Sequence, residues 1–99
     1  MIHKKVHLSG KEADGYVIPL GPVNLVAVVT DTGMLGCGAF DVVVLDRFSY
    51  PAVRAGSLDG SPISTVDDLL NAVVKEANQE AGKRGITTGM TGEEALDLL

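Results

Sequence analysis

The stretch NLVAVVTDTGMLGCGAFD, residues 24–41, decides how the chain folds. Its apolar, β-branched run from Leu25 to Val29 predicts a strand buried on both faces, and therefore central in its sheet. The run stops at residues 31–33, a short turn in which Gly33 is available for a positive φ. Residues 34–40 are the expected partner strand, although glycines weaken a strand interior. Repeated glycine indicates close approach by a backbone or a ligand, so we expect the chemistry here.

The composition limits what kind of protein this is. Ninety-nine residues, 45% of them apolar, supply one domain, 1–99, with one core. A chain of this size buries only roughly 60–70% of its unfolded surface, so self-association would help to stabilise it.

The net charge of −5 disfavours nucleic acid and anionic membranes as partners. One cysteine forms no internal disulfide and no cysteine-based zinc site, and we expect no cofactor. No apolar segment approaches a membrane span, so we expect a soluble, cytoplasmic protein.

The N-terminal region predicts a β-hairpin. Residues 2–8 alternate imperfectly, residues 9–12 form a turn, and residues 16–18 return as a strand that ends at the proline-rich segment 19–22. A lone two-stranded hairpin is marginally stable, so it must pack on the core, residues 24–99, or on another copy. We predict that residues 1–20 mediate homo-oligomerisation. His3 and His7 lie about 13 Å apart on a strand, too far to hold one metal ion.

The remaining segments predict short helices around one more strand. Asp41 is a suitable N-cap for a helix over 41–49, although three consecutive valines would also suit a strand. A short strand is expected at 52–58. Capping signals and apolar periodicity predict helices over 64–71, 72–84 and 92–99, with Gly85 as a left-handed C-terminal cap. The fold class is therefore α+β: a mostly antiparallel sheet with three to four short helices.

Two short motifs in the central stretch invite catalytic interpretations. Asp31-Thr32-Gly33 after an apolar strand resembles a retroviral-type aspartic protease, in which two subunits each donate one aspartate. The helical region 64–84 opposes this, because that fold is nearly all β, and a plain turn is favoured. Residues 36–41 nearly copy the dinucleotide fingerprint G-x-G-x-x-G. Asp41 replaces the third glycine, and its carboxylate would repel a pyrophosphate.

Cys37 and Arg54 are the remaining chemical candidates. A thiol near a helix N-terminus can act as a nucleophile, so Cys37, with Asp41 beside it, is the candidate catalytic set. The competing interpretation is a buried structural cysteine. Any histidine base must come from residues 3 or 7, or from a neighbouring subunit. Arg54 on its short strand could bind a carboxylate or phosphate, or pair with Asp41 or Asp46. Gly36, Gly38 and Arg54 are the candidate ligand-binding residues.

Two blocks of sequence carry a family resemblance. One runs from Asn24 through Gly33 to Cys37-Gly38-Ala39-Phe40-Asp41-Val42, and the other is GITTGMTGEEAL, residues 85–96. With these blocks the chain resembles the YunC-like family, a small domain of bacteria and archaea without an assigned function. The resemblance implies an N-terminal β region that mediates tetramerisation and a helix after Asp41, but no reaction or cofactor. We therefore predict a homo-oligomeric module, a tetramer or dimer, that binds a small polar ligand at residues 36–41. The alternative is a thiol-dependent enzyme that uses Cys37.

Overall fold

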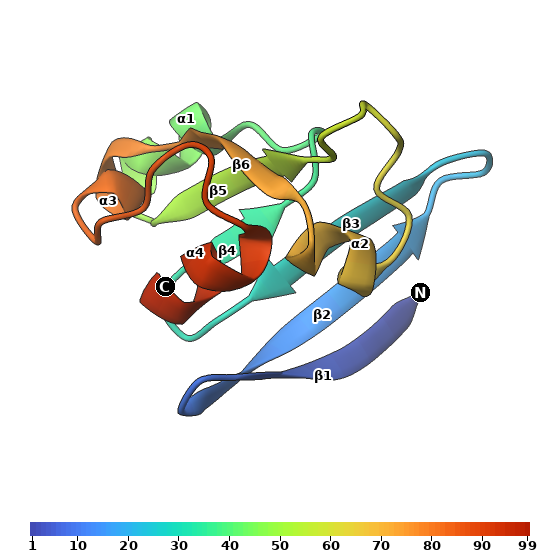
Figure 1. Ribbon diagram of the computed structural model, residues 1–99, viewed down its shortest axis with the longest axis horizontal. Helices are drawn as coiled ribbons and strands as arrows, with labels where there is room; N and C mark the ends of the chain where they lie inside the picture. The colour runs from blue at the N-terminus through green and yellow to red at the C-terminus, as the bar shows by residue number, and fades with distance from the viewer.

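The computed structural model describes residues 1–99 and contains one six-stranded sheet whose strands follow one another in chain order (Figure 1). The strands are β1 (Ile2–Leu8), β2 (Lys11–Pro19), β3 (Asn24–Val29), β4 (Met34–Gly36), β5 (Ala52–Gly56) and β6 (Val73–Ala77). Every neighbouring pair is antiparallel except β4 and β5, which are parallel. The helices are α1 (Val42–Leu45), the 3-10 helix η1 (Asp46–Phe48), α2 (Val66–Leu70), α3 (Gln79–Gly82) and α4 (Gly92–Leu98). The predicted α+β fold class is confirmed.

The parallel pair exists because α1 and η1 carry the chain from β4 to β5. Asp41 has extended backbone and its carboxylate accepts a hydrogen bond from the Val44 N–H at 3.2 Å, which caps α1 as predicted. This cap and the burial of Val42 fix the valine run as a helix despite its strand propensity. The 3-10 helix η1 ends at its C-cap Ser49, whose φ of 54° is left-handed.

The prediction of a helix over 72–84 is wrong. Residues 73–77 form β6, which pairs with β5, and only residues 79–82 are helical. The adjacent β-branched residues Val73 and Val74 are more stable in a paired strand than on the apolar face of a helix. The apolar periodicity of the sequence does not show this preference. Asn78 starts α3 because its side chain accepts from the Ala81 N–H, and Gly85, at φ +89°, takes the left-handed position as predicted.

Three smaller predictions need correction around the central strands. Strand β4 ends at Gly36, because residues 37–40 form a turn in which the Phe40 N–H donates to the Cys37 carbonyl. Strand β5 likewise ends at Gly56 rather than at residue 58. Gly33 does not have a positive φ; a side chain there would collide with the Pro51 backbone carbonyl. Position 33 requires glycine because the backbone of Pro51 packs closely against it, not because the turn needs a positive φ.

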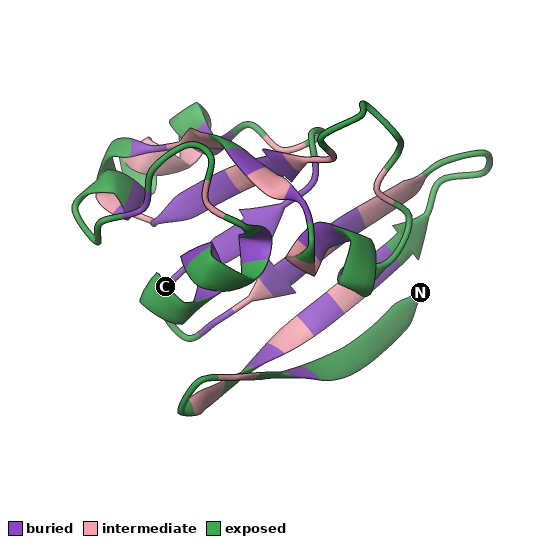
Figure 2. Ribbon diagram, viewed as in Figure 1, coloured by how far each residue is buried: buried purple, intermediate pink, exposed green.

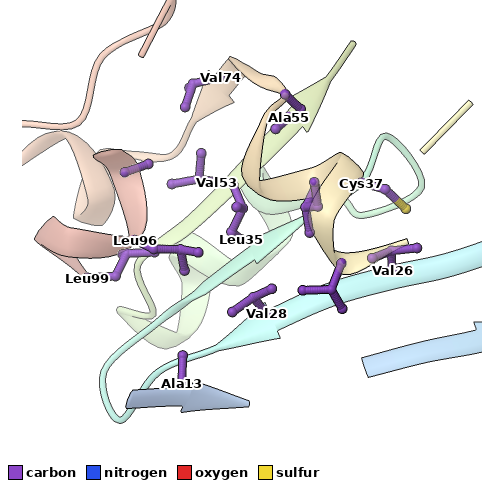
Figure 3. Close-up of a cluster of buried hydrophobic side chains, with 14 of the residues drawn as sticks. Ala13, Val26, Val28, Leu35, Cys37, Val53, Ala55, Val74, Leu96 and Leu99 are labelled. Atoms are coloured by element: carbon purple, nitrogen blue, oxygen red, sulfur yellow. The ribbon is translucent and has the colours of Figure 1, made fainter. Parts of the chain in front are cut away.

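Side chains are buried on both faces of the sheet. The larger cluster lies beneath α2 and α4 and includes Val28, Leu35 and Leu96 (Figure 3). A smaller cluster of Met34, Val42 and Ala52 lies on the α1 side. Figure 2 shows that the edge strand β1 is exposed along most of its length. None of the helices combines the length and the hydropathy that a membrane-spanning segment needs.

Candidate functional site

A cleft of about 740 Å³ lies at one end of the sheet, where β3 begins and β4 and β5 end. Its walls are the loop before β3, the turn after β4, and the loop from Ser57 to Ser64 that leads to α2. Its titratable residues are Arg54, Lys75 and Cys37, with no aspartate or glutamate among those that line it. The lining therefore contributes two cations, of which Arg54 is paired with Glu76 just outside the lining.

Arg54 reaches the cleft from β5. It is the parallel register partner of Gly36 and the antiparallel partner of Glu76. Its Nε donates to Glu76 Oε1 at 3.2 Å, and its side chain remains 34% exposed. This contact fixes the guanidinium through one edge and leaves the terminal nitrogens available to a ligand. Planar donors of this kind suit carboxylate and phosphate oxygens.

Lys75 reaches the cleft because β6 carries a bulge. Arg54 pairs with Glu76 and Ala55 pairs with Val74, so Lys75 is an extra residue without a partner on β5. Strict alternation would place Lys75 on the face opposite Glu76, but the bulge leaves Lys75 exposed while Val74 stays in the core. The lysine therefore shares the face of Arg54.

The environment of Lys75 distinguishes it from the other lysines. Its side chain passes over Gly56, where a Cβ would lie 3.5 Å from Lys75 Cε. The other lysines pair with acidic side chains or, for Lys11, with backbone carbonyls, whereas Lys75 makes no such contact. Lys75 is thus the one lysine of the chain whose ammonium has no internal partner, and it lines the cleft.

The loop over the cleft is ordered by its own polar groups. The Ser57 hydroxyl donates to the Ser61 carbonyl at 2.6 Å, and the Ser61 N–H donates to Asp59 at 3.0 Å. Hydrogen bonds from Ser61, and then from Ser57, lower the pKa of Asp59. Asn24 joins this loop to the start of β3, since its side-chain amide donates to the Ser64 carbonyl at 3.0 Å. The two loops that border the cleft are thus connected.

Of the glycines and the cysteine predicted for the site, Gly36 packs against a core side chain, whereas Gly38 and Cys37 line the cleft. A Cβ on Gly36 would collide with the Phe40 ring, so this glycine accommodates a core side chain. Gly38 has no atom within 4 Å of its Cβ position and lines the cleft. Cys37 is 6% exposed, and Figure 3 shows it at the margin of the core cluster with its sulfur directed away from Leu35. It contributes to the cleft wall, yet no histidine or carboxylate hydrogen-bonds to the sulfur.

Comparison with known proteins identifies the relatives of this chain. A family model described as a domain of unknown function, DUF1805, matches residues 36–99. The chain belongs to the DUF1805 family. The uncharacterized protein YunC of Bacillus subtilis (strain 168) is 33% identical over 92 residues, which cover 92% of this chain and 89% of YunC. The resemblance to the YunC-like family is therefore confirmed.

A solved structure has the same fold as this DUF1805 chain. It is the crystal structure of a protein of unknown function, TA1206 from Thermoplasma acidophilum, with a TM-score of 0.85 and 28% identity. The similarity covers 97% of this chain and 89% of that one. The TA1206 structure thus has the same α+β architecture as this chain, and none of these names assigns a reaction.

Several residues singled out from the sequence lie away from the cleft of this DUF1805 chain. Asp41 is exposed and its carboxylate caps α1 rather than lining the cleft. Asp46 accepts from the backbone N–H groups of Gln79 and Glu80, at 3.0 and 3.2 Å, and so caps α3. Neither aspartate pairs with Arg54, which uses Glu76 instead.

The histidines and the Asp-Thr-Gly segment have local roles. His3 and His7 lie on β1 and contact different acids, Asp14 at 2.8 Å and Glu12 at 3.0 Å. No group of three or more histidine, cysteine or acidic side chains is placed to hold a metal ion. Residues 31–33 form the β3–β4 turn, whose backbone N–H groups donate to the buried Thr30 hydroxyl. The turn interpretation of this segment accounts for these contacts.

Sequence reasoning missed Lys75 and the loop from Ser57 to Ser64. The predicted helix over 72–84 includes Lys75, and a lysine on the exposed side of a helix needs no explanation. The only available signal was the pair of valines before it, which favours a strand. The bulge that turns the lysine toward the cleft depends on the register with β5, which no local pattern encodes.

Proposed function

We propose that this protein binds a small anionic molecule, through a carboxylate or phosphate group, in the cleft beside Arg54 and Lys75. The observation that carries the proposal is the unpaired Lys75 ammonium on the same face as the Arg54 side chain, which is one-third exposed. The surrounding chain is acidic, so a cationic cleft of this kind concentrates anions locally. Gly38 leaves the wall open for close approach, and the Ser57–Ser64 loop offers hydroxyl and backbone groups to the ligand.

Self-association through residues 1–20 is the second part of the proposal. Strand β1 is a sheet edge, and only one of its seven residues is buried. Ile2, Ile18 and Leu20 are exposed apolar side chains at one end of this hairpin. The edge lysines Lys4 and Lys5 are paired with acids of the same chain, so their charges do not oppose a second copy. We propose a dimer or tetramer built on this surface.

The ligand-binding proposal is tested by titrating 15N-labelled protein with inorganic phosphate and with acetate while recording amide shifts. We expect saturable shifts at Gly38 and Gly56, and weaker binding by roughly three- to tenfold in Lys75→Gln, because a charge-assisted contact is lost. Lys83→Gln is the matched control: it removes the same charge from a lysine that is paired with Glu80, outside the cleft.

Two results would refute the anion-binding proposal. One is the absence of saturable shifts with either anion at constant ionic strength. The other is an equal effect of Lys75→Gln and Lys83→Gln, which would show a response to net charge rather than a site.

The self-association proposal has its own test, light scattering coupled to gel filtration. Ile18→Lys should yield monomers, whereas Phe48→Lys, at an exposed site on η1, should not.

A further inference from the structure

Two apolar side chains that line the cleft are each more than half exposed. Leu58 is 84% exposed, more than any other large apolar residue of the chain, and Val23 is 57% exposed. Both line the cleft, one from each of the two loops that Asn24 joins through its bond to Ser64. Leaving such surface in water is unfavourable, at about 25 cal/mol per Å² of apolar area. Because Leu58 and Val23 line the same cleft as Arg54, their apolar surface points to a use in the same site.

Building on the proposed anion binding, we propose that the ligand is an amphiphilic anion. Its acidic group binds Arg54 and Lys75, and its apolar body, such as a medium-length alkyl chain, lies against Leu58 and Val23. The cleft divides accordingly: both cations come from the strands β5 and β6, and both exposed apolar side chains come from loops. A bare inorganic anion would use only the first part.

The size of the cleft supports this class of ligand. Sites for small molecules have volumes of about 300–1,000 Å³, and this cleft has about 740 Å³. A phosphate or acetate ion would leave most of that space to water. A ligand with an extended apolar body would fill the space and cover Leu58, while its single acidic group satisfies the local charge.

The experiment is a chain-length series. Acetate, butyrate, hexanoate and octanoate carry the same carboxylate on a growing alkyl chain, and each is titrated against the 15N-labelled protein. We expect affinity to rise about three- to fourfold for each methylene that becomes buried, up to the length of the cleft. In Leu58→Ser the affinity for octanoate should fall by at least fivefold, while that for acetate stays unchanged. Phe48→Ser, a substitution at a 73% exposed residue away from the cleft, should change neither affinity.

The outcomes separate this inference from the function on which it rests. If all four carboxylates bind with equal affinity, anion binding stands and the amphiphilic ligand is refuted. If none binds, and phosphate does not bind either, the proposed function itself fails. A gain with chain length that persists in Leu58→Ser, or that disappears equally in Phe48→Ser, would place the apolar contact outside this cleft and also overturn the inference.

Discussion

Asn78 should contribute more to stability than any other polar residue of the chain. It is 4% exposed and makes four hydrogen bonds. Its side-chain oxygen accepts from the N–H groups of Ala52 and Ala81, at 3.1 and 3.0 Å. Its amide donates to the carbonyls of Val42 and Tyr50, at 3.0 and 2.8 Å. One side chain thus joins α1, the start of β5 and the start of α3.

Replacing Asn78 by alanine removes all four hydrogen bonds at once. A net contribution of about 1 kcal/mol for each gives a loss of about 3–4 kcal/mol in the free energy of unfolding. For a domain of this size, such a loss lowers Tm by roughly 15–25 °C. Because small domains are stable by only about 5–15 kcal/mol, the variant should remain folded at room temperature but melt early.

Urea unfolding followed by circular dichroism measures this loss directly. Asn78→Asp keeps the shape of the side chain but points a carboxylate at two carbonyl oxygens, so it should be less stable than Asn78→Ala at neutral pH. Burial and those carbonyls raise the pKa of the introduced acid, so its deficit should shrink as the pH falls. Gln79→Ala, one residue along and exposed, is the control and should change stability by less than about 0.5 kcal/mol. A loss below about 1 kcal/mol in Asn78→Ala would show that solvent replaces these bonds and would refute the reasoning.

Two further predictions concern the glycines of the central stretch and the charges of the hairpin. Gly36→Ala should lower stability by about 1–3 kcal/mol, because its methyl group would displace the Phe40 ring, whereas Gly38→Ala should be nearly neutral; equal losses in urea unfolding would contradict this. A hydrogen bond from Lys5 lowers the pKa of Asp14 in the folded state. The ionised carboxylate therefore stabilises the fold at pH values above the pKa of the unfolded chain. This stabilisation is lost as the pH falls through the lower pKa of the folded state. Lys5→Met should raise the pKa of Asp14 in an NMR titration of its carboxyl carbon, and an unchanged midpoint would exclude the pairing in solution.

Local signals in the sequence were sufficient for two of the helix caps. Asp41 caps the helix that follows it, and the Thr91–Glu94 capping box is present at the start of α4. These caps join residues three positions apart, so sequence spacing alone predicts them. The sequence also predicts the N-terminal hairpin, but its return strand β2 begins at Lys11 rather than at residue 16. The α+β class follows from the sum of such elements.

Non-local contacts decided the rest. Gly36 looked like an opening for a ligand, but its missing side chain is matched by the Phe40 ring, whose position depends on the turn after β4. Arg54 could be assigned to a strand but not to a partner, since Glu76 lies opposite it only once β6 is recognised as a strand. Because residues 72–84 were predicted as a helix, the prediction of the site lacked both Glu76, the partner of Arg54, and Lys75, the second cation of the cleft.

The bulge in β6 explains how one chain combines a closed core with a charged cleft. Without the extra residue, strict alternation after Glu76 would direct Lys75 toward the core face and Val74 toward solvent. Burying an unpaired ammonium costs free energy, whereas burying a valine is favourable, so that arrangement would destabilise the sheet. The bulge keeps Val74 buried and adds Lys75 to the face of Arg54. The same local irregularity thus preserves the apolar core and supplies the positive charge on which the proposed ligand site depends.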